Sequence, residues 1–187
     1  MSPSPLPAGD GAVTFSTPAG DASGRRDYAV VNQPIGDSLL SILRTSGPNY
    51  AVALPRTDKT VTLELKNATV EEALRAVLRQ AGLPQRYRTE IATGAVSLSP
   101  IDNGPGLVRP DALRLSGAFA EMPVWDAINS MGHVIRNYTL DEALKKCVVT
   151  LAFKERTIAK LFKDIEGVAS PPITTDFTGG LLKVRAR

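Results

Sequence analysis

The stretch VTLELKNATVEEALRAVLRQAGL, residues 61–83, changes its hydrophobic period halfway along. Val61, Leu63 and Leu65 alternate with polar residues, which is the two-residue period of a half-buried strand. From Val70 onward the apolar residues follow the spacing of one helix face, at positions 70, 73, 74, 77 and 78. The stretch therefore predicts a strand followed directly by an amphipathic helix.

Both ends of that helix carry specific signals. Thr69 is followed three residues later by Glu72, a capping box in which the two side chains satisfy unpaired N–H groups at the helix start. Gly82 accepts the left-handed conformation that commonly ends a helix, and Leu83 can fold back onto the last turn. We therefore predict a helix between Thr69 and Gly82.

The same pattern returns near the C-terminus, in CVVTLAFKERTIAKLFKDIEGV, residues 147–168. An alternating segment again gives way to a helical stripe, and both are displaced by 88 residues from those of the first stretch. One difference separates the two: Thr157 is followed at the third position by Lys160 and not by an acid. We expect the second helix to lose the reciprocal half of its capping box.

The flanking segments repeat as well. A helix with a proline near its first turn is predicted in QPIGDSLLSILRTSG and again in MPVWDAINSMG. Asn-Tyr at residues 49–50 recurs at residues 137–138, with the same displacement of 88. Short strands precede the two helices, over residues 28–32 and 113–119. YRTEIATGAVSL and ITTDFTGGLLKV both predict hairpins that turn on a Thr-Gly element.

The predicted fold class is α+β, with two tandem β-α-β-β-α-β-β units, each built of two helices packed on small mixed sheets. Residues 1–24, rich in Pro, Gly and Ser, are expected to be a flexible tail. Residues 25–100 form the first unit, 101–110 a Gly/Pro-rich linker, and 111–187 a second, divergent copy.

One short acidic segment is open to two interpretations. Asp141 and Glu142 in NYTLDEALKK either lie in a turn before the strand at Val148 or begin a helical extension capped by Thr139. The repeat requires a strand on either side, which favours the turn.

The composition is that of a soluble globular protein. Of 187 residues, 43% are hydrophobic and 22% charged, and no run reaches the roughly 18 apolar residues of a membrane helix. The net charge of +3 is spread among acidic residues, which favours a solvated surface over a nucleic-acid footprint. The N-terminal MSPSPLPAGDGAVTF shows no signal-peptide pattern.

The residues that catalysis and metal binding require are scarce. His133 is the only histidine and Cys147 the only cysteine, so neither a histidine-based catalytic arrangement nor the usual zinc sites is expected. The neighbours of Cys147 indicate a buried residue at the start of a strand. The glycines in DNGPG and TGG do not follow a phosphate-binding order. We expect no enzyme activity, no cofactor and no metal.

The repeated stretch resembles the short N-terminal domain shared by secretins and TonB-dependent transducers. The resemblance is carried by VTLELKNATVEEALRAVLRQAGL, with IGDSLLSIL and NYAVAL upstream in the expected order. It covers residues 27–98 well. Over residues 113–185 it is looser, because KERTIAKLFKDIEG keeps the spacing but not the acidic helix start.

This resemblance implies a periplasmic, non-enzymatic module whose signal peptide is missing from the sequence. In secretins such domains stack into rings below an outer-membrane channel and contact inner-membrane partners of a secretion or type IV pilus machine. In transducers, a single such domain docks a regulatory protein. The resemblance thus implies protein partners in the cell envelope or self-association into a ring, and no small-molecule substrate.

Two kinds of contact surface follow from these expectations. The first strand of either unit could accept a strand from a partner, which makes Tyr28, Val30, Asn32 and Leu115 candidate partner-binding residues. Trp125, on the first helix of the second unit, is either an exposed interface anchor or a residue at the edge of the core. Alternatively, faces of the two units could meet between copies and close a ring.

Overall fold

The computed structural model describes residues 14–16, 24–83, 87–92, 95–100, 112–135, 137–178 and 181–187. The predicted linker, residues 101–110, lies outside these ranges, as do the turn residues of the two predicted hairpins. For clarity we call residues 24–100 the first half and residues 112–187 the second half.

The first half alternates strands and helices in the predicted order. After β1 (Thr14–Ser16) come β2 (Arg26–Pro34), α1 (Ile35–Arg44), β3 (Tyr50–Pro55), β4 (Thr60–Ala68), α2 (Val70–Gln80), β5 (Tyr87–Ala92) and β6 (Ala95–Pro100).

The second half runs through the same order with two short additions, α4 and the 3-10 helix η2. Its elements are β7 (Leu113–Pro123), α3 (Val124–Ser130), α4 (Gly132–Ile135), β8 (Asn137–Leu140), η2 (Glu142–Lys146), β9 (Val148–Arg156), α5 (Ile158–Val168), β10 (Ile173–Thr178) and β11 (Leu181–Ala186). The prediction that favoured a turn at Asp141 and Glu142 is wrong, because Glu142 begins the helix η2. The helical alternative is correct except for its cap, which is Asp141 and not Thr139: the Asp141 side chain accepts a hydrogen bond from the N–H of Ala143.

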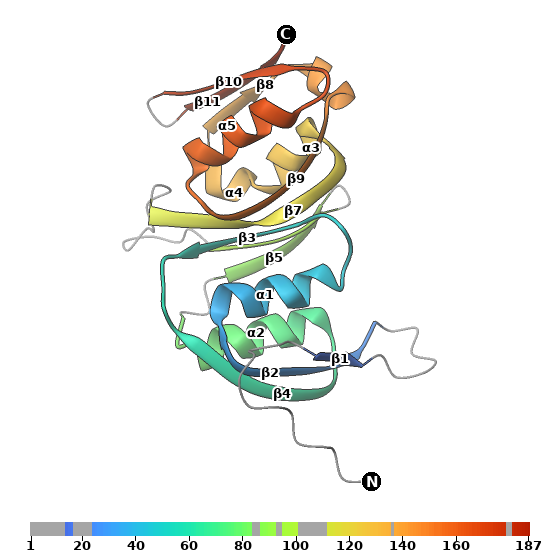
Figure 1. The fold of residues 1–187 in the computed structure, drawn as a ribbon, viewed down its shortest axis with the longest axis vertical. Coiled ribbons are helices and arrows are strands. Elements are labelled where there is room, and N and C mark those ends of the chain that lie inside the picture. Colours follow the sequence, from blue (N-terminus) through green and yellow to red (C-terminus); the bar gives the residue numbers. More distant parts are fainter. Residues whose placement is uncertain are drawn as a thin grey trace.

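Helix layers alternate with sheets along the long axis of the molecule (Figure 1). The outer sheets have the strand orders β1-β2-β4 and β10-β11-β8, and a five-stranded sheet of order β5-β6-β3-β7-β9 lies between the two helix layers. In each half the helix pair therefore has a sheet on either side. The predicted α+β class with small mixed sheets is confirmed.

The middle sheet joins the two halves through β3 and β7. These strands pair antiparallel over six residue pairs, from Tyr50↔Ala118 to Pro55↔Leu113. Successive side chains of a strand point to opposite faces of the sheet. Accordingly, Tyr50, Val52 and Leu54 belong to the core of the first half, whereas Ala51 and Ala53 belong to the core of the second. β3 thus contributes side chains to both hydrophobic cores.

The two halves share their strand registers as well as their element order. In the ladder β2·β4 the pairs Tyr28↔Leu65 and Val30↔Leu63 flank the centre of the strands. In the ladder β7·β9 the pairs Gly117↔Phe153 and Phe119↔Leu151 hold the same positions relative to the ends. The six pairs of the hairpin β5·β6 likewise recur in β10·β11. That the halves are copies of one unit stays a prediction, which these registers support.

The ladders β2·β4 and β7·β9 are interrupted by bulges at the same places. Asn32 and Asn67 have φ values of 45° and 51°, and Glu121 and Glu155 have φ values of 48° and 50°. This left-handed region is uncommon for residues other than glycine. Each bulged N–H is held by a side chain of the opposite strand, as in Asn32 N to Thr62 Oγ1 at 2.8 Å and Glu121 N to Thr150 Oγ1 at 2.9 Å.

The helix starts agree with the sequence analysis. The capping box of α2 is complete: Thr69 Oγ1 accepts from the N–H of Glu72, and Glu72 Oε2 accepts from the N–H of Thr69. In α5, Thr157 Oγ1 accepts from the N–H of Lys160, and the lysine cannot return the bond. The predicted loss of the reciprocal half is confirmed.

The predicted flexible tail, residues 1–24, requires one correction. Thr14–Ser16 form β1 and pair with β2, so the prediction is wrong for these three residues. The reason is that β2 presents a free edge whose backbone groups a neighbouring segment can satisfy.

Candidate interaction surfaces

The first candidate surface is the edge of β2 that faces away from β4. β1 pairs with this edge antiparallel over three residues, Thr14↔Ala29, Phe15↔Tyr28 and Ser16↔Asp27. From Val30 to Pro34, no strand in the described part of the chain pairs with the same edge. An edge with unpaired backbone groups is a template for pairing with another chain.

Three predicted partner-binding residues lie on β2, and two of them are core residues. The side chains of Tyr28 and Val30 are fully buried in the core of the first half, so only their backbone could meet a partner. Asn32 is exposed, and its Oδ1 accepts a hydrogen bond from Thr60 Oγ1 at 3.0 Å. Of the three side chains, only that of Asn32 lies on the surface.

The prediction that a partner adds a strand at Leu115 is wrong. Leu115 lies on β7, which has β3 on one side and β9 on the other, so neither edge of this strand is open there. The Leu115 side chain is 2% exposed and packs in the core of the second half. The predicted edge exists, but β3 of the same chain already occupies it.

Trp125, on α3, fits the second of the two interpretations that the sequence left open, a residue at the edge of the core; its role as an interface anchor stays a prediction. Its indole is half-buried and packs against the core of the second half. The ammonium of Lys145 lies 4.7 Å from the ring centroid, which is a cation–π contact. Trp125 is therefore a residue at the edge of the core with a basic neighbour.

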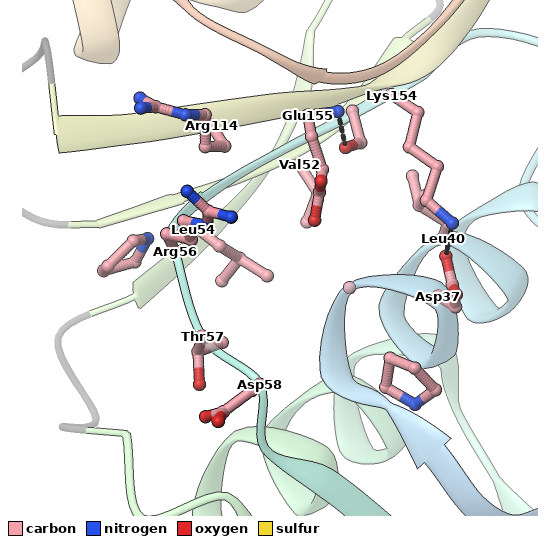
Figure 2. Close-up of a pocket in the computed structure, with 14 residues that line it drawn as sticks. Asp37, Leu40, Val52, Leu54, Arg56, Thr57, Asp58, Arg114, Lys154 and Glu155 are labelled. Carbon is pink, nitrogen blue, oxygen red and sulfur yellow. Dashed lines mark hydrogen bonds and ion pairs between the residues drawn. The ribbon is translucent and has the colours of Figure 1, made fainter.

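A second candidate surface is a groove where the two halves meet (Figure 2). It has a volume of about 340 Å³, and its walls come from α1, the segment after β3, β7 and β9. Figure 2 shows Arg114 and Lys154 on the side of the second half, opposite Asp37 and Asp58 of the first. Charges of both signs line the groove: Asp37, Arg56, Asp58, Arg114, Lys154 and Glu155.

An adjoining cavity of about 470 Å³ continues the groove along α1. Gln33, at the end of β2, lines this cavity and is 8% exposed. Its Oε1 has no hydrogen-bond partner among the described atoms. A buried acceptor without a donor is costly, and a donor group from a bound chain would relieve that cost.

The two cavities meet at an ion pair between the halves. Lys154 Nζ of β9 lies 2.8 Å from Asp37 Oδ1 in the first turn of α1. The hydrogen bond to Asp37 raises the pKa of Lys154, which stays charged at neutral pH. Because the Lys154 side chain is 65% exposed, water and salt screen the pair and it contributes little stability. A charged partner could therefore displace it readily.

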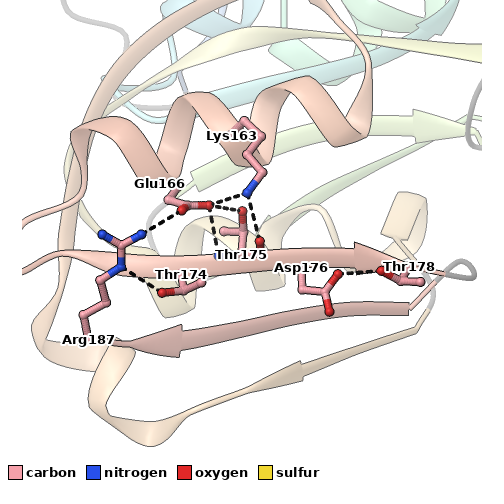
Figure 3. A network of polar contacts seen from close by, with 7 residues as sticks. All are labelled: Lys163, Glu166, Thr174, Thr175, Asp176, Thr178 and Arg187. Carbon is pink, nitrogen blue, oxygen red and sulfur yellow. Dashed lines mark hydrogen bonds and ion pairs between the residues drawn. The ribbon is translucent and has the colours of Figure 1, made fainter.

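The strongest polar cluster lies elsewhere, between α5 and the outer sheet of the second half (Figure 3). Glu166 Oε2 accepts from Lys163 Nζ at 2.8 Å and from Thr175 Oγ1 at 2.6 Å, and Oε1 accepts from Arg187 Nη2 at 3.1 Å. The bonds from Lys163 and Thr175 lower the pKa of Glu166 to about 2. Both oxygens of the Glu166 carboxylate thus accept hydrogen bonds from neighbouring side chains. The cluster holds β10 against α5, and its carboxylate is not free to react.

The described residues contain no cluster suited to metal binding. Within those ranges no three His, Cys, Asp or Glu side chains are placed to hold a metal ion. Cys147 is buried at 1% exposure, and desolvation raises the pKa of its thiol, which disfavours the reactive thiolate. His133 lies in the short helix α4. None of the described helices combines the length and hydropathy that crossing a bilayer requires.

Sequence reasoning missed the groove and the sharing of β3. Both depend on how the halves pack together, and periodicity within one segment carries no information on that packing. One signal was present: β3, YAVALP, is apolar at every position, which is typical of a strand buried on both faces.

Comparisons with known proteins give no relative for this chain. No family model, no curated protein and no solved structure matches it.

Proposed function

We propose that this chain is a non-enzymatic assembly module of a secretin-like protein of the cell envelope. In this proposal it acts in the periplasm, as part of a secretion or type IV pilus machine, by binding protein partners and by stacking in a ring. The basis is the resemblance of residues 27–98 to the short N-terminal domain of secretins, together with the junction between the halves.

The observation that carries the proposal is the pairing of β3 with β7. The two halves are joined because a strand of one completes a sheet of the other, with six residue pairs and side chains in both cores. A unit that joins its neighbour in this way is suited to building larger assemblies, since main-chain hydrogen bonds supply affinity and alternate side chains supply specificity.

The polar groove supports a binding role over a catalytic one. Its acidic and basic groups lie across from one another, and Asp37 and Lys154 neutralise each other at 2.8 Å. A chemical site instead needs a nucleophile next to a base that is oriented by a third group. A groove of alternating charge suits a polar segment of another protein.

Site-specific photocrosslinking in intact cells tests the proposal. A crosslinking residue replaces Val31, which is 42% exposed on β2, in one variant and Arg56, in the groove, in another. The matched control carries it at Glu71, which is exposed on α2 and does not line the groove. We expect the first two positions, but not the control, to capture an inner-membrane component of a secretion or pilus machine.

Two other outcomes would change the conclusion. Capture of an envelope regulator that controls a sigma factor would favour the signalling domain of a TonB-dependent transducer. Equal capture at all three positions, or capture of cytoplasmic proteins alone, would contradict an envelope assembly role.

A further inference from the structure

The edge of β2 is equivalent to the edge of β7 that binds β3. Residues 27–29 of β2 and 116–118 of β7 hold the same positions in the ladders with β4 and β9. On β7, residues 116–118 pair antiparallel with residues 50–52 of β3. On β2, residues 27–29 pair antiparallel with residues 14–16 of β1. Residue by residue, β1 takes the place on β2 that β3 takes on β7.

The second half has its own counterpart of β3, which is β8. Tyr50 of β3 pairs in parallel with Val96 of β6, and Tyr138 of β8 pairs in parallel with Leu182 of β11, at matching positions of the two hairpins. The sequences agree, NYAV at residues 49–52 and NYTL at 137–140. Within the described ranges β8 is the last strand of its sheet, with β11 as its neighbour.

We propose that copies of this chain join head to tail, with β8 of one copy pairing with β2 of the next in the register of β3 on β7. The expected pairs are Tyr138↔Ala29, Thr139↔Tyr28 and Leu140↔Asp27, and β1 must leave β2 before they form. This inference deepens the proposed assembly function and rests on it, because it names a second copy as the partner of the β2 edge.

An asparagine at the junction provides a separate argument. Asn49 Oδ1 accepts a hydrogen bond from the N–H of Ala120 at 2.8 Å, which ties the start of β3 to β7. The counterpart of Asn49 is Asn137, which is exposed, and the counterpart of Ala120 is Val31, which is 42% exposed on β2. Joining β8 to β2 in this register brings Asn137 Oδ1 to the N–H of Val31, the equivalent of the bond that Asn49 accepts from Ala120. The exposed Asn137 side chain thereby gains a donor.

β2 carries Tyr28 where β7 carries Gly117, so β8 cannot approach β2 as closely as β3 approaches β7. β1 shows that a strand in this register still fits opposite Tyr28, and it also explains how joining is restrained. As a segment of the same chain, β1 competes at an effective concentration of about a millimolar. Free copies are therefore expected to stay apart until β1 is displaced. Because β2 and β8 are different surfaces, the contact is heterologous and repeats into a closed ring or an open stack.

The experiment weakens β1 within the full-length chain. Thr14→Pro and Ser16→Pro together remove two backbone N–H groups from β1 and disfavour its pairing with β2. We expect sedimentation velocity to show a single species at 19.9 kDa for the unmodified chain. For the double proline variant we expect the weight-average mass to rise with concentration to at least about twice that value.

A substitution on β8 then tests the surface. Thr139 is exposed and lies opposite Lys183 in the sheet, so Thr139→Glu gains a basic neighbour in the free chain but carries a charge into the joined interface. Added to the double proline variant, it should abolish the concentration dependence. Thr174→Glu, placed opposite Arg185 on the far strand of the same sheet, is the matched control and should leave association unchanged.

Disulfide formation between copies tests the register. One chain carries Ala29→Cys and the other Tyr138→Cys, both with the double proline change, and only their mixture should form a disulfide-linked dimer. A double proline variant that stays monomeric, or one whose association survives Thr139→Glu, would overturn the inference. If copies do not associate in this way while the crosslinker at Val31 still captures an envelope component, the inference is wrong and the proposed function is retained.

Discussion

The ladders β2·β4 and β7·β9 have the same strand register but carry different side chains at equivalent positions. Tyr28 faces Leu65 in the first, whereas Gly117 faces Phe153 at the equivalent place in the second. The large aromatic ring has thus moved from one strand to the other. A glycine on β7 leaves room for β3 to approach closely, and the ring of Phe153 fills the space that a side chain at residue 117 would have taken. Strand register is thus retained while side-chain volume is exchanged across the ladder.

The largest effect is expected at the glycine itself. A Cβ atom at residue 117 would lie 2.2 Å from the carbonyl oxygen of Tyr50 and 2.9 Å from Cα of Ala51. Both are backbone atoms of β3, so Gly117→Val should lower the free energy of unfolding by about 3 kcal/mol or more. Chemical denaturation measures the change.

The control for that change is Gly167→Ala on α5, where an added Cβ meets nothing within 4 Å. It should leave stability unchanged or raise it by up to about 1 kcal/mol. A Gly117→Val protein of unaltered stability would mean that β3 and β7 are not tightly joined.

The next largest effects are expected from core substitutions in each half, which test whether the two halves unfold together. Leu74 of α2 and Phe162 of α5 are equivalent core residues, exposed by 0% and 2%. Leu74→Ala and Phe162→Ala should each cost about 3 kcal/mol. Because β3 belongs to both cores, we expect calorimetry to show one transition that either substitution lowers. Two transitions, each sensitive to one substitution, would show that the halves are energetically independent.

An effect of roughly 1–2 kcal/mol is expected from the carboxylate of Glu166, after discounting for its exposed partners. Its pKa is lowered to about 2 in the folded protein from an ordinary value of 4.5. The contribution is therefore complete above about pH 4.5 and is lost as the pH falls through about 2. Glu166→Gln should reduce stability at pH 7 and flatten the pH dependence in that window. Glu71→Gln, on the exposed face of α2, is the control.

The smallest effects separate the two helix caps. Thr69→Ala should cost about 1 kcal/mol, more than Thr157→Ala, because only the first cap is reciprocal. Lys160→Glu supplies the missing acid and should stabilise the second half by about 0.5 kcal/mol. Thermal unfolding of the three variants measures the differences. Equal costs at both threonines would remove the distinction between the caps.

The sequence predicts much of the fold because its strongest signals are local. The change of period after Leu65, the cap at Thr69 and the proline before each first helix each depend on a few neighbouring residues, and the structure places the elements accordingly. The bulges could not be predicted in this way. Asn67 and Glu155 adopt left-handed conformations because a side chain on the facing strand holds their N–H groups.

The candidate site was predicted less well. Periodicity identifies Val30 and Leu115 as strand residues, but it does not show which strand edge stays open after the halves pack. That depends on β3, whose pairing with β7 spans residues about 60 positions apart. The groove and the unpaired Gln33 acceptor depend on the same packing, so only the three-dimensional arrangement shows them.

The double membership of β3 has a consequence for any attempt to divide the molecule. A fragment cut before residue 112 would keep β3 but lose β7, which would expose Ala51 and Ala53 to water and leave one edge of β3, six residues long, without its partner strand. Such a long apolar rim promotes aggregation. Conversely, a fragment starting at residue 112 would lack β3, whose residues Ala51 and Ala53 complete the core of the second half. Useful truncations therefore keep both halves with β11 intact and remove residues only from the N-terminal end.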